Sequence, residues 1–322
     1  MFKFTPILKS LVWGGDRIAA YKGIASSEHS IGESWELSGL PGNENVVAEG
    51  PDAGMTLAEL IRRDGSALLG KANYARFGEE FPLLVKFLDA SRDLSVQVHP
   101  NDELARKRHN SSGKSEMWYI VKADDDAHLH LGFRRAVTPE EYERAVEEHT
   151  VLDLMSDYAV SEGDAFYLPS GRIHTIGAGT FLVEIQQPSD ITYRIYDYGR
   201  LGVDGKPRKL HTELAREVID FEVLPDYRLH YDAAKNRPVE IVRCDYFTTS
   251  LYDLTANHRM ELGALDSFVV LVCTEGEGRL IDDRGEQISL RCGETVLVSA
   301  ATQWLDVELT TPTMKILSAY VA

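Results

Sequence analysis

The chain has 322 residues, which fits two domains or one domain with a large elaboration. Its 43% hydrophobic and 26% charged residues are ordinary for a folded globular protein, and they exclude disorder, collagen-like repeats and coiled coil as the main organisation. The net charge of −17 disfavours nucleic acid and anionic lipid as partners, because both are themselves negatively charged.

Most apolar runs are short, rich in Val, Ile, Leu, Phe and Tyr, and separated by Gly, Pro, Asp and Asn. This pattern predicts a mainly β fold of the sandwich or barrel type. The predicted strands cover residues 83–89, 94–99, 116–122, 164–168, 180–186, 191–198, 246–252, 267–273, 295–299 and 313–321.

Capping residues predict a few short helices between these strands. Thr56 begins a capping box before LAELIRR, and Asn101 or Asp102 can cap ELARKR. Thr138 precedes a proline and two glutamates before YERAVEEH, which is typical of a helix start. A fourth helix is predicted over 212–220.

The charged segment 225–240 contains Pro225 and Pro238 and reads as a link between two domains. We therefore predict a catalytic, metal-binding domain with helical insertions over residues 1–235. A smaller β domain is predicted over residues 236–322.

The segment LSVQVHPND at 94–102 predicts a strand with one polar face. In a strand, alternate side chains share a face, so Ser95, Gln97 and His99 project together, opposite Leu94 and the two valines. Such a face is either exposed to solvent or occupied by a ligand.

Residues 163–174 read GDAFYLPSGRIH, with Gly163, Pro169, Gly171 and His174 in the pattern G-x5-P-x-G-x2-H. This pattern resembles the second conserved motif of the cupin superfamily. There, Gly and Pro make tight turns at strand ends, and the His points into a jelly-roll barrel to bind a metal. The resemblance implies two jelly-roll (cupin) β-barrels or sandwiches with a few short inserted helices.

The first cupin motif supplies two His and one Glu, at positions occupied here by Gln97, His99 and Glu116. With His174 these give donors of types N, O and N, and the amide oxygen of Gln97 would be a fourth. Such a set suits Zn²⁺ with an open position, and also Fe²⁺ or Mn²⁺.

Over most of residues 5–215, the sequence closely resembles the type I phosphomannose isomerases in their short bacterial form. Together the matching segments are highly specific. They are Leu11–Gly15, IGESWELS at 31–38, FPLLVKFLDA at 81–90, LSVQVHPND at 94–102, KSEMWYI at 114–120, LPSGRIHTIGAG at 168–179 and EIQQPSDITYRIYDYGR at 184–200.

The resemblance implies interconversion of mannose 6-phosphate and fructose 6-phosphate, with one zinc ion per chain. It implies that Arg194 is catalytic and that Lys86, Ser95, Lys114 and Glu184 line the pocket. Larger members of the family carry an extra helical domain, for which this chain lacks the length. Many members also have an aromatic residue where this chain has Ile176.

Alternation along the strands supports a polar pocket. Lys86 shares a strand face with two leucines, and a lysine amid apolar residues is costly to bury without an anion. Glu184 and Arg194 are charged residues on the predicted strands FLVEIQQ and ITYRIYDY, where their strand-face neighbours are partly polar. An exposed outer face is the alternative. By contrast, IGESWELS is interpreted as a mainly structural strand.

These residues suggest roles in an aldose–ketose isomerisation through a cis-enediol. Arg194 is expected to stabilise the enediolate or to shuttle hydroxyl protons rather than to act as the base, because a guanidinium is a poor general base. Glu184 or a zinc-bound water is the candidate base, with Lys114 as a further catalytic residue. Lys86 and Ser95 are predicted to face the phosphate.

The segment GETVLVSAATQW at 293–304 aligns with GDAFYLPSGRIH, with Trp304 at the position of His174. Ser267 likewise takes the position of Glu116. The C-terminal domain is therefore interpreted as a second cupin that has lost its metal ligands. Chance similarity between two β segments is the alternative.

Three classes of function remain to be compared: a zinc sugar-phosphate isomerase, another cupin enzyme such as an iron oxygenase or a different sugar-phosphate isomerase, and a non-catalytic carbohydrate-sensing protein. The anion-seeking Lys86 and Arg194 favour the first. The chain has no apolar run long enough to span a membrane, and its start lacks a signal-peptide core. We therefore expect a cytoplasmic monomer or homodimer whose partner is a small sugar phosphate.

Overall fold

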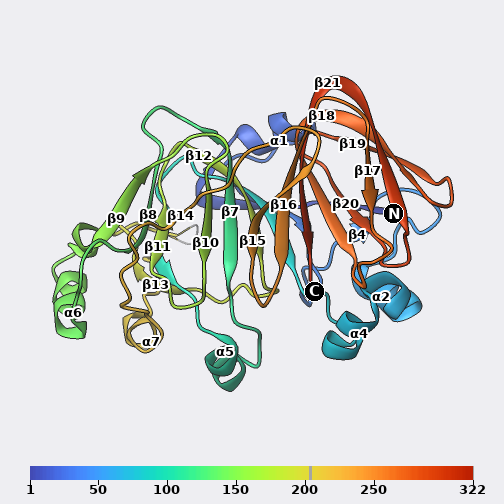
Figure 1. Cartoon of the computed structure of the whole chain (residues 1–322). Helices are drawn as coiled ribbons and strands as arrows, with labels where there is room; N and C mark the ends of the chain where they lie inside the picture. Colours follow the sequence, from blue (N-terminus) through green and yellow to red (C-terminus); the bar gives the residue numbers. More distant parts are fainter. Residues whose placement is uncertain (203–204, 322) are drawn as a thin grey trace.

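The computed structural model describes residues 1–202 and 205–321. It is mainly β with few helices, as predicted, and its described strands form three sheets. Figure 1 shows two β units side by side, with strands β7 to β13 in one and β17 to β21 in the other. Among the described residues, no helix is both long enough and apolar enough to cross a membrane.

The first unit is a sandwich of two antiparallel sheets. The five-stranded sheet has the order β13 (Tyr193–Tyr196), β6 (Val96–Val98), β11 (His174–Ile176), β8 (His128–Phe133) and β9 (Met155–Ala159). The seven-stranded sheet has the order β14 (Arg228–Leu229), β10 (Ala165–Leu168), β7 (Glu116–Ala123), β12 (Thr180–Gln186), β5 (Leu84–Asp89), β3 (Ile31–Leu37) and β2 (Ile7–Gly15).

The second unit is built on a nine-stranded sheet. Its main path runs β15 (Pro238–Arg243), β16 (Thr248–Leu254), β21 (Trp304–Tyr320), β18 (Val269–Asp282), β20 (Thr295–Val298), β1 (Phe2–Thr5) and β4 (Val46–Val47), with β17 (His258–Glu261) on β21 and β19 (Gln287–Arg291) on β18. The predicted runs 267–273 and 313–321 are therefore parts of much longer strands.

The seven-stranded sheet is the middle layer of the molecule. On one face, Leu88 and Trp118 pack in a buried cluster with Leu129 of the five-stranded sheet. On the other face, Val85 shares a second cluster with Val270 of the nine-stranded sheet. Because both faces are covered, β5 and β12 are buried along their whole length. A charged side chain on these strands therefore needs a partner inside the protein.

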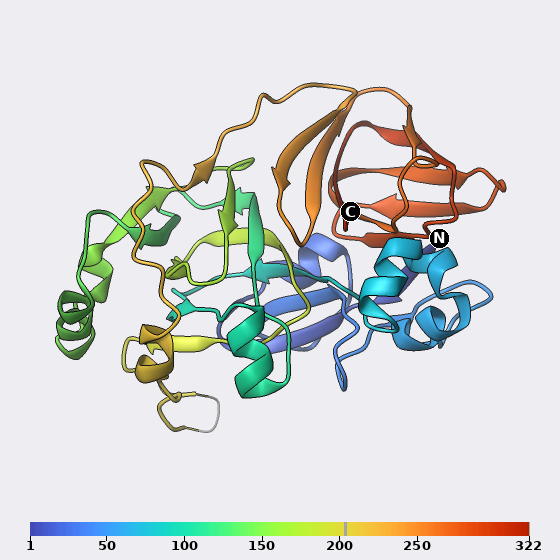
Figure 2. The same ribbon diagram turned by 60° about the horizontal axis from the view of Figure 1, so that its bottom comes forward.

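The predicted boundary at residue 235 stays a prediction, and strands pair across it. Phe2 of β1 lies opposite Leu297 of β20, and β4 pairs with β1, so two early strands complete the late sheet. The segment 225–240 contributes β14 to the first unit and reaches β15 of the second. Figure 2 shows this segment passing along one side of the molecule from one unit to the other.

The three stronger helix predictions are confirmed. Thr56 caps α2 (Leu57–Asp64) in a capping box, Asn101 caps α5 (Asp102–His109), and Thr138 caps α6 (Pro139–Glu147). The fourth, α7 (Thr212–Arg216), is shorter than the predicted 212–220. Four short elements lacked a clear signal in the sequence: α1 (Arg17–Lys22), α3 (Ser66–Leu69), α4 (Lys71–Phe77) and the 3₁₀ turn η1 (Val151–Leu154).

Candidate active site

A polar cavity of about 230 Å³ opens between the two sheets of the first unit. Six of the nine predicted site residues line it: Lys86, Ser95, Gln97, Lys114, Glu184 and Arg194. The other three predicted residues, His99, Glu116 and His174, form a buried cluster that contacts Lys114 and Gln97. The structure therefore brings together all nine residues.

The three predicted metal ligands come from three neighbouring strand ends. Their ligand atoms lie within 4.8 Å of one another, and all three side chains are buried. His174 Nε2 is 3.3 Å from Glu116 Oε1, and His99 Nε2 is 3.7 Å from Glu116 Oε2. This is the arrangement expected of residues that share one cation.

Hydrogen bonds on the far side of each ring fix which nitrogen faces the cluster. His99 Nδ1 lies 2.8 Å from the carbonyl of Ile191, and His174 Nδ1 lies 2.8 Å from the carbonyl of Arg172. A carbonyl only accepts, so both Nδ1 atoms carry the proton and both Nε2 atoms present a lone pair.

The electrostatics of the cluster also fit a cation. Burial, with the nearby Lys114 ammonium, holds the pKa of His99 well below its usual value, and burial lowers the pKa of His174 to about 3. Burial and the neighbouring Glu184 raise the pKa of Glu116, whose Oε1 atom has no hydrogen-bond donor among the described residues. The two Nε2 lone pairs and the undonated Oε1 of Glu116 thus converge beside the Lys114 ammonium, and a bound metal cation would satisfy them.

Gln97 lies beside this cluster. Gln97 of β6 lies directly opposite His174 of β11 in the sheet, and its side-chain Nε2 is 3.3 Å from His174 Nε2. The amide nitrogen and oxygen of glutamine are nearly equivalent in shape, so rotation of the amide exchanges a donor for an acceptor at this point. The predicted fourth ligand is therefore within reach of the cluster.

Charged side chains of alternating sign follow one another along the cavity, and we call this series the charged row. It consists of Glu33, Lys86, Glu184, Lys114 and Glu116. Lys86 Nζ is 3.0 Å from Glu184 Oε1 and 3.7 Å from Glu33 Oε2. Glu184 Oε1 is also 3.7 Å from Lys114 Nζ, and Lys114 hydrogen-bonds Glu116. Adjacent strands create this row, because Lys86 and Glu184 are directly opposite in the β5–β12 ladder.

The row sets the protonation states of its members. Burial alone would lower the pKa of Lys86 and raise that of Glu184. The opposite charges outweigh burial, so the pKa of Lys86 is raised by Glu184 and Glu33, and the pKa of Glu184 lies well below its usual range because of Lys114 and Lys86. Trp118 Nε1 also donates to Glu184 Oε2 at 2.9 Å. The exposed outer face considered for Lys86 and Glu184 is wrong.

Arg194 reaches the cavity from β13. Its Nε donates to Ser95 Oγ at 3.2 Å, and its Nη1 donates to the carbonyl of Lys209 at 3.0 Å. The nearby carboxylate of Asp197 is occupied by Arg200 at 2.6 Å and by Arg208 at 2.7 and 2.5 Å.

Arg194 therefore keeps its charge available to a ligand. Among the residues that the structure describes, no carboxylate lies within ion-pair distance of its guanidinium. Burial, with the nearby Arg208 and Arg200, lowers its pKa from the usual value. An anionic ligand would relieve this repulsion.

The sequence analysis missed several residues that line the cavity: Trp13, Glu33, Trp35, Asp190, Thr192 and Arg208. The strand IGESWELS is structural on one face only, where Ser34 hydrogen-bonds Glu36. Its alternate residues, Glu33 and Trp35, face the cavity, and alternation in the sequence was the available signal. Ile176 lines the cavity as well, and the two tryptophans supply aromatic surface there.

In the second unit we compare the residues that the sequence aligned with the cupin motif of the first unit, namely Gly293 with Gly163, Ser267 with Glu116 and Trp304 with His174. Gly163 and Gly293 both have a positive φ, of 91° and 82°, which suits glycine at matching turns. Ser267 is buried and accepts a hydrogen bond from Asn73, while the ring of Trp304 stacks with Arg259.

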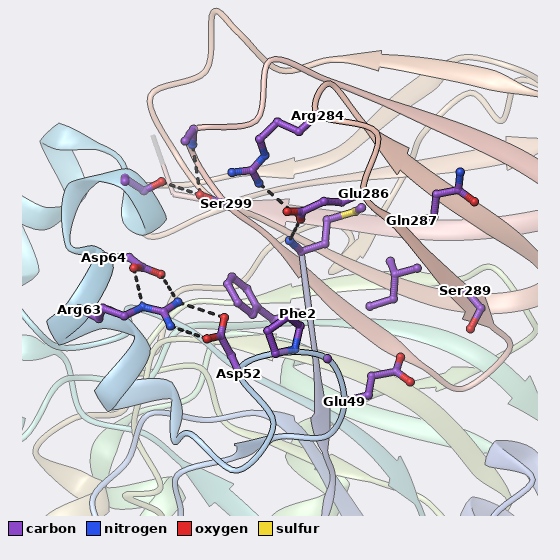
Figure 3. A pocket seen from close by; sticks show the side chains of 16 residues that line it. Phe2, Glu49, Asp52, Arg63, Asp64, Arg284, Glu286, Gln287, Ser289 and Ser299 are labelled. Atoms are coloured by element: carbon purple, nitrogen blue, oxygen red, sulfur yellow. Dashed lines mark hydrogen bonds and ion pairs between the residues drawn. The ribbon is translucent and has the colours of Figure 1, made fainter.

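A larger hollow of about 810 Å³ shares no lining residue with the cavity of the first unit and lies between α2 and the β19 region (Figure 3). Its charged groups are partnered with one another. Arg63 binds Asp52 and Asp64, and Arg284 lies 3.7 Å from Glu286. Its described lining therefore has neither the ligand cluster nor a guanidinium without a carboxylate partner, both of which the cavity in the first unit has.

Comparison with known proteins agrees with this geometry. Residues 1–131 match the model of the phosphomannose isomerase type I catalytic domain, and residues 239–318 match that of the mannose-6-phosphate isomerase cupin domain. The chain is 37% identical over 281 residues to mannose-6-phosphate isomerase ManA of Bacillus subtilis, which covers 86% of each chain. The chain belongs to the type I phosphomannose isomerase family.

Other members of the type I phosphomannose isomerase family resemble the chain over most of its length. A mannose-6-phosphate isomerase of Streptococcus mutans is 31% identical over 288 residues, covering 89% of this chain and 88% of the relative. The crystal structure of the mannose 6-phosphate isomerase from Bacillus subtilis superposes with a TM-score of 0.88 at 28% identity and covers 99% of each chain. The predicted fold and family are therefore confirmed, and the chain is a metal-dependent isomerase on a cupin scaffold.

Proposed function

We propose that the chain interconverts mannose 6-phosphate and fructose 6-phosphate in the cavity between the two sheets of the first unit. The observation that carries this proposal is the pairing of two features in one cavity. A buried cluster of His99, Glu116 and His174 lies next to the charged row, and Arg194, which pairs with no carboxylate of the described residues, lines the same cavity. An aldose–ketose isomerase needs both, since its substrate is anionic and its intermediate develops further negative charge on oxygen.

We propose zinc as the metal, one ion per chain, held by His99, Glu116 and His174 with Gln97 as the fourth ligand. Two imidazole nitrogens and one carboxylate are a common catalytic zinc set that leaves a position open. When bound, the metal would polarise the substrate oxygens near C1 and C2. The same donors also accept iron or manganese, so metal analysis decides this part of the proposal.

The reaction moves one proton between neighbouring carbons. In the direction of the ketose, the C2 proton leaves the aldose while O1 gains a proton, which gives a cis-enediol. A proton is then added to C1 while O2 loses its hydroxyl proton. Glu184 is our candidate base, because it is ionised and buried at the cavity wall. Its low pKa makes it a weak base, and stabilisation of the enediolate by the cations beside it offsets this weakness.

Lys114 and Arg194 are the proposed cations. Lys114 lies between Glu184 and the metal cluster, where its ammonium can donate to a substrate oxygen. Arg194 approaches from the opposite sheet and, among the described residues, forms no ion pair with a carboxylate. Both groups are fixed before substrate arrives, so they stabilise the intermediate without reorganising.

Lys86 and Ser95 remain our predicted phosphate contacts. Both line the cavity, but each already has an interaction partner within the protein, unlike the groups of an open anion site. Lys86 already balances two carboxylates, and the Ser95 hydroxyl accepts from Arg194. Kinetics on a Lys86 variant, described in the Discussion, separates phosphate binding from a role in holding Glu184.

Purified protein tests the proposal directly. We expect about one zinc per chain by elemental analysis, and turnover of mannose 6-phosphate in an assay coupled to fructose 6-phosphate. Glucose 6-phosphate and ribose 5-phosphate serve as matched alternative substrates. Metal-loaded protein that turns over another sugar phosphate, and leaves mannose 6-phosphate unchanged, would contradict the proposed substrate.

We place the activity in the cytoplasm, where sugar phosphates occur, and expect a monomer or homodimer.

A further inference from the structure

We propose that His211 is a positioning residue for Arg194. This inference rests on the proposed function, because it assigns to His211 the task of holding the guanidinium that stabilises the enediolate. His211 lies at the start of α7, outside the cavity lining, and does not reach the substrate space. Its effect would therefore pass entirely through Arg194.

The contacts between the two residues are reciprocal. The Arg194 carbonyl accepts from the His211 backbone N–H at 2.7 Å, and the Arg194 backbone N–H donates to His211 Nδ1 at 3.2 Å. Two residues earlier, the carbonyl of Lys209 accepts from Arg194 Nη1 at 3.0 Å. The segment 209–211 thus holds both the backbone and the guanidinium of Arg194.

The place of β13 in the fold explains why a side chain is needed. β13 is the edge strand of the five-stranded sheet, and only its β6 side is paired with another strand. The N–H of Arg194 on the open side needs an acceptor, because an unpaired backbone group is costly to bury. The imidazole supplies this acceptor, where a continuing strand would have supplied a carbonyl.

The imidazole must be neutral at Nδ1 to accept. Its charged and titratable neighbours are Arg194, Lys209 and His109, and Tyr193 contributes a ring at 6.2 Å. Burial and these cationic neighbours lower the pKa of His211 from its usual value, which keeps the acceptor available at neutral pH.

The segment that carries His211 is itself anchored. Asp197 binds Arg208, three residues before His211, and also Arg200, whose guanidinium donates to the carbonyl of Asp93. The acceptor therefore sits on a segment that is tied to the residue after β13 and, through Arg200, to the segment before β6. A fixed acceptor can hold Arg194 in one place, as a catalytic guanidinium requires.

The variants His211→Asn and His211→Gln test the position of the acceptor. Asn places an oxygen near the former Nδ1, whereas Gln moves it one carbon further. We expect kcat for mannose 6-phosphate to stay within about threefold in His211→Asn and to fall about tenfold in His211→Gln and His211→Ala, the scale of one lost hydrogen bond. His109→Asn is the matched control, since His109 is an exposed neighbour that bonds Tyr193 rather than Arg194.

A double-mutant cycle with Arg194→Ala separates positioning from general stability. If His211 acts through Arg194, adding His211→Gln to Arg194→Ala should lower kcat by less than about twofold, with metal content unchanged in all variants. A full tenfold loss in the Arg194→Ala background would overturn the inference, as would equal kcat in the Asn and Gln variants. If Arg194→Ala itself kept wild-type kcat, the proposed function of Arg194 would fail instead.

Discussion

Replacing Lys86 by Met tests the buried charge row. The ammonium lies 3.0 Å from Glu184 and is about 5% exposed, so its removal leaves a buried carboxylate without its nearest cation. Breaking such a pair costs about 3–5 kcal/mol. Lys114, 3.7 Å from the same oxygen, remains as a partner, which places the expected loss near the lower end, at about 3 kcal/mol.

Urea unfolding followed by tryptophan fluorescence measures this loss, and a melting curve should shift by about 6 °C at roughly 2 °C per kcal/mol for a chain of this size. Lys122→Met is the matched control, because Lys122 is exposed on β7 of the same sheet, and we expect less than about 0.5 kcal/mol there. The double variant Lys86→Met with Glu184→Leu should regain about 2 kcal/mol by removing the orphaned charge.

The reasoning about the row is wrong if Lys86→Met costs less than 1 kcal/mol, or if the double variant is as unstable as the sum of the single ones. Steady-state kinetics on the Lys86→Met variant separates the two roles that Lys86 can have in the reaction. A higher KM at constant kcat would support the predicted phosphate contact of Lys86, whereas a lower kcat would assign Lys86 to holding Glu184.

The remaining predictions concern the metal, the guanidinium, the second unit and pH. His174→Ala should abolish turnover and lower bound metal well below one per chain by elemental analysis; full metal content with full turnover would contradict the cluster. Arg194→Ala should lower kcat by about 10²–10³-fold with metal content unchanged, and a pure KM effect would make it a phosphate anchor. Trp304→His should bind no second metal in the same measurement, because Ser267 supplies no carboxylate. The arginine partners of Asp197 lower its pKa against the effect of burial, so its contribution to stability is complete above its unfolded pKa of about 3.9 and is lost as pH falls. In urea titrations between pH 6 and 3, Asp197→Asn should have a lower free energy of unfolding than the wild type at pH 6, and that free energy should change less with pH.

The resemblance to the two cupin motifs was needed to predict the cluster of His99, Glu116 and His174. Strand alternation alone placed Ser95, Gln97 and His99 on one polar face, but it did not link that face to Glu116 or His174. The same alternation predicted that Lys86 would need an anion, and the structure supplies Glu184 directly opposite.

Long-range features could not be predicted in this way. Arg208 enters the cavity from a segment outside the strands, and its contact with Asp197 depends on how that segment folds back. Glu33 carried a usable signal, but the apolar residues around it favoured a structural interpretation. The short helices α3 and α4 are delimited by Gly65, Gly70 and Gly78 with positive φ, and four to seven residues give too little periodicity to identify.

The pairing of β1 with β20 has a consequence for how the protein is made in the cell. Phe2 is translated among the first residues, yet its strand partner at Leu297 follows almost at the end of the chain. At about 5–20 residues per second, the interval is on the order of 15–60 s. During this time β1 can pair with β4, but its other edge has no strand partner and is open to pairing with another nascent chain. Ribosome-bound intermediates should therefore hold a largely formed metal site well before the second sheet closes.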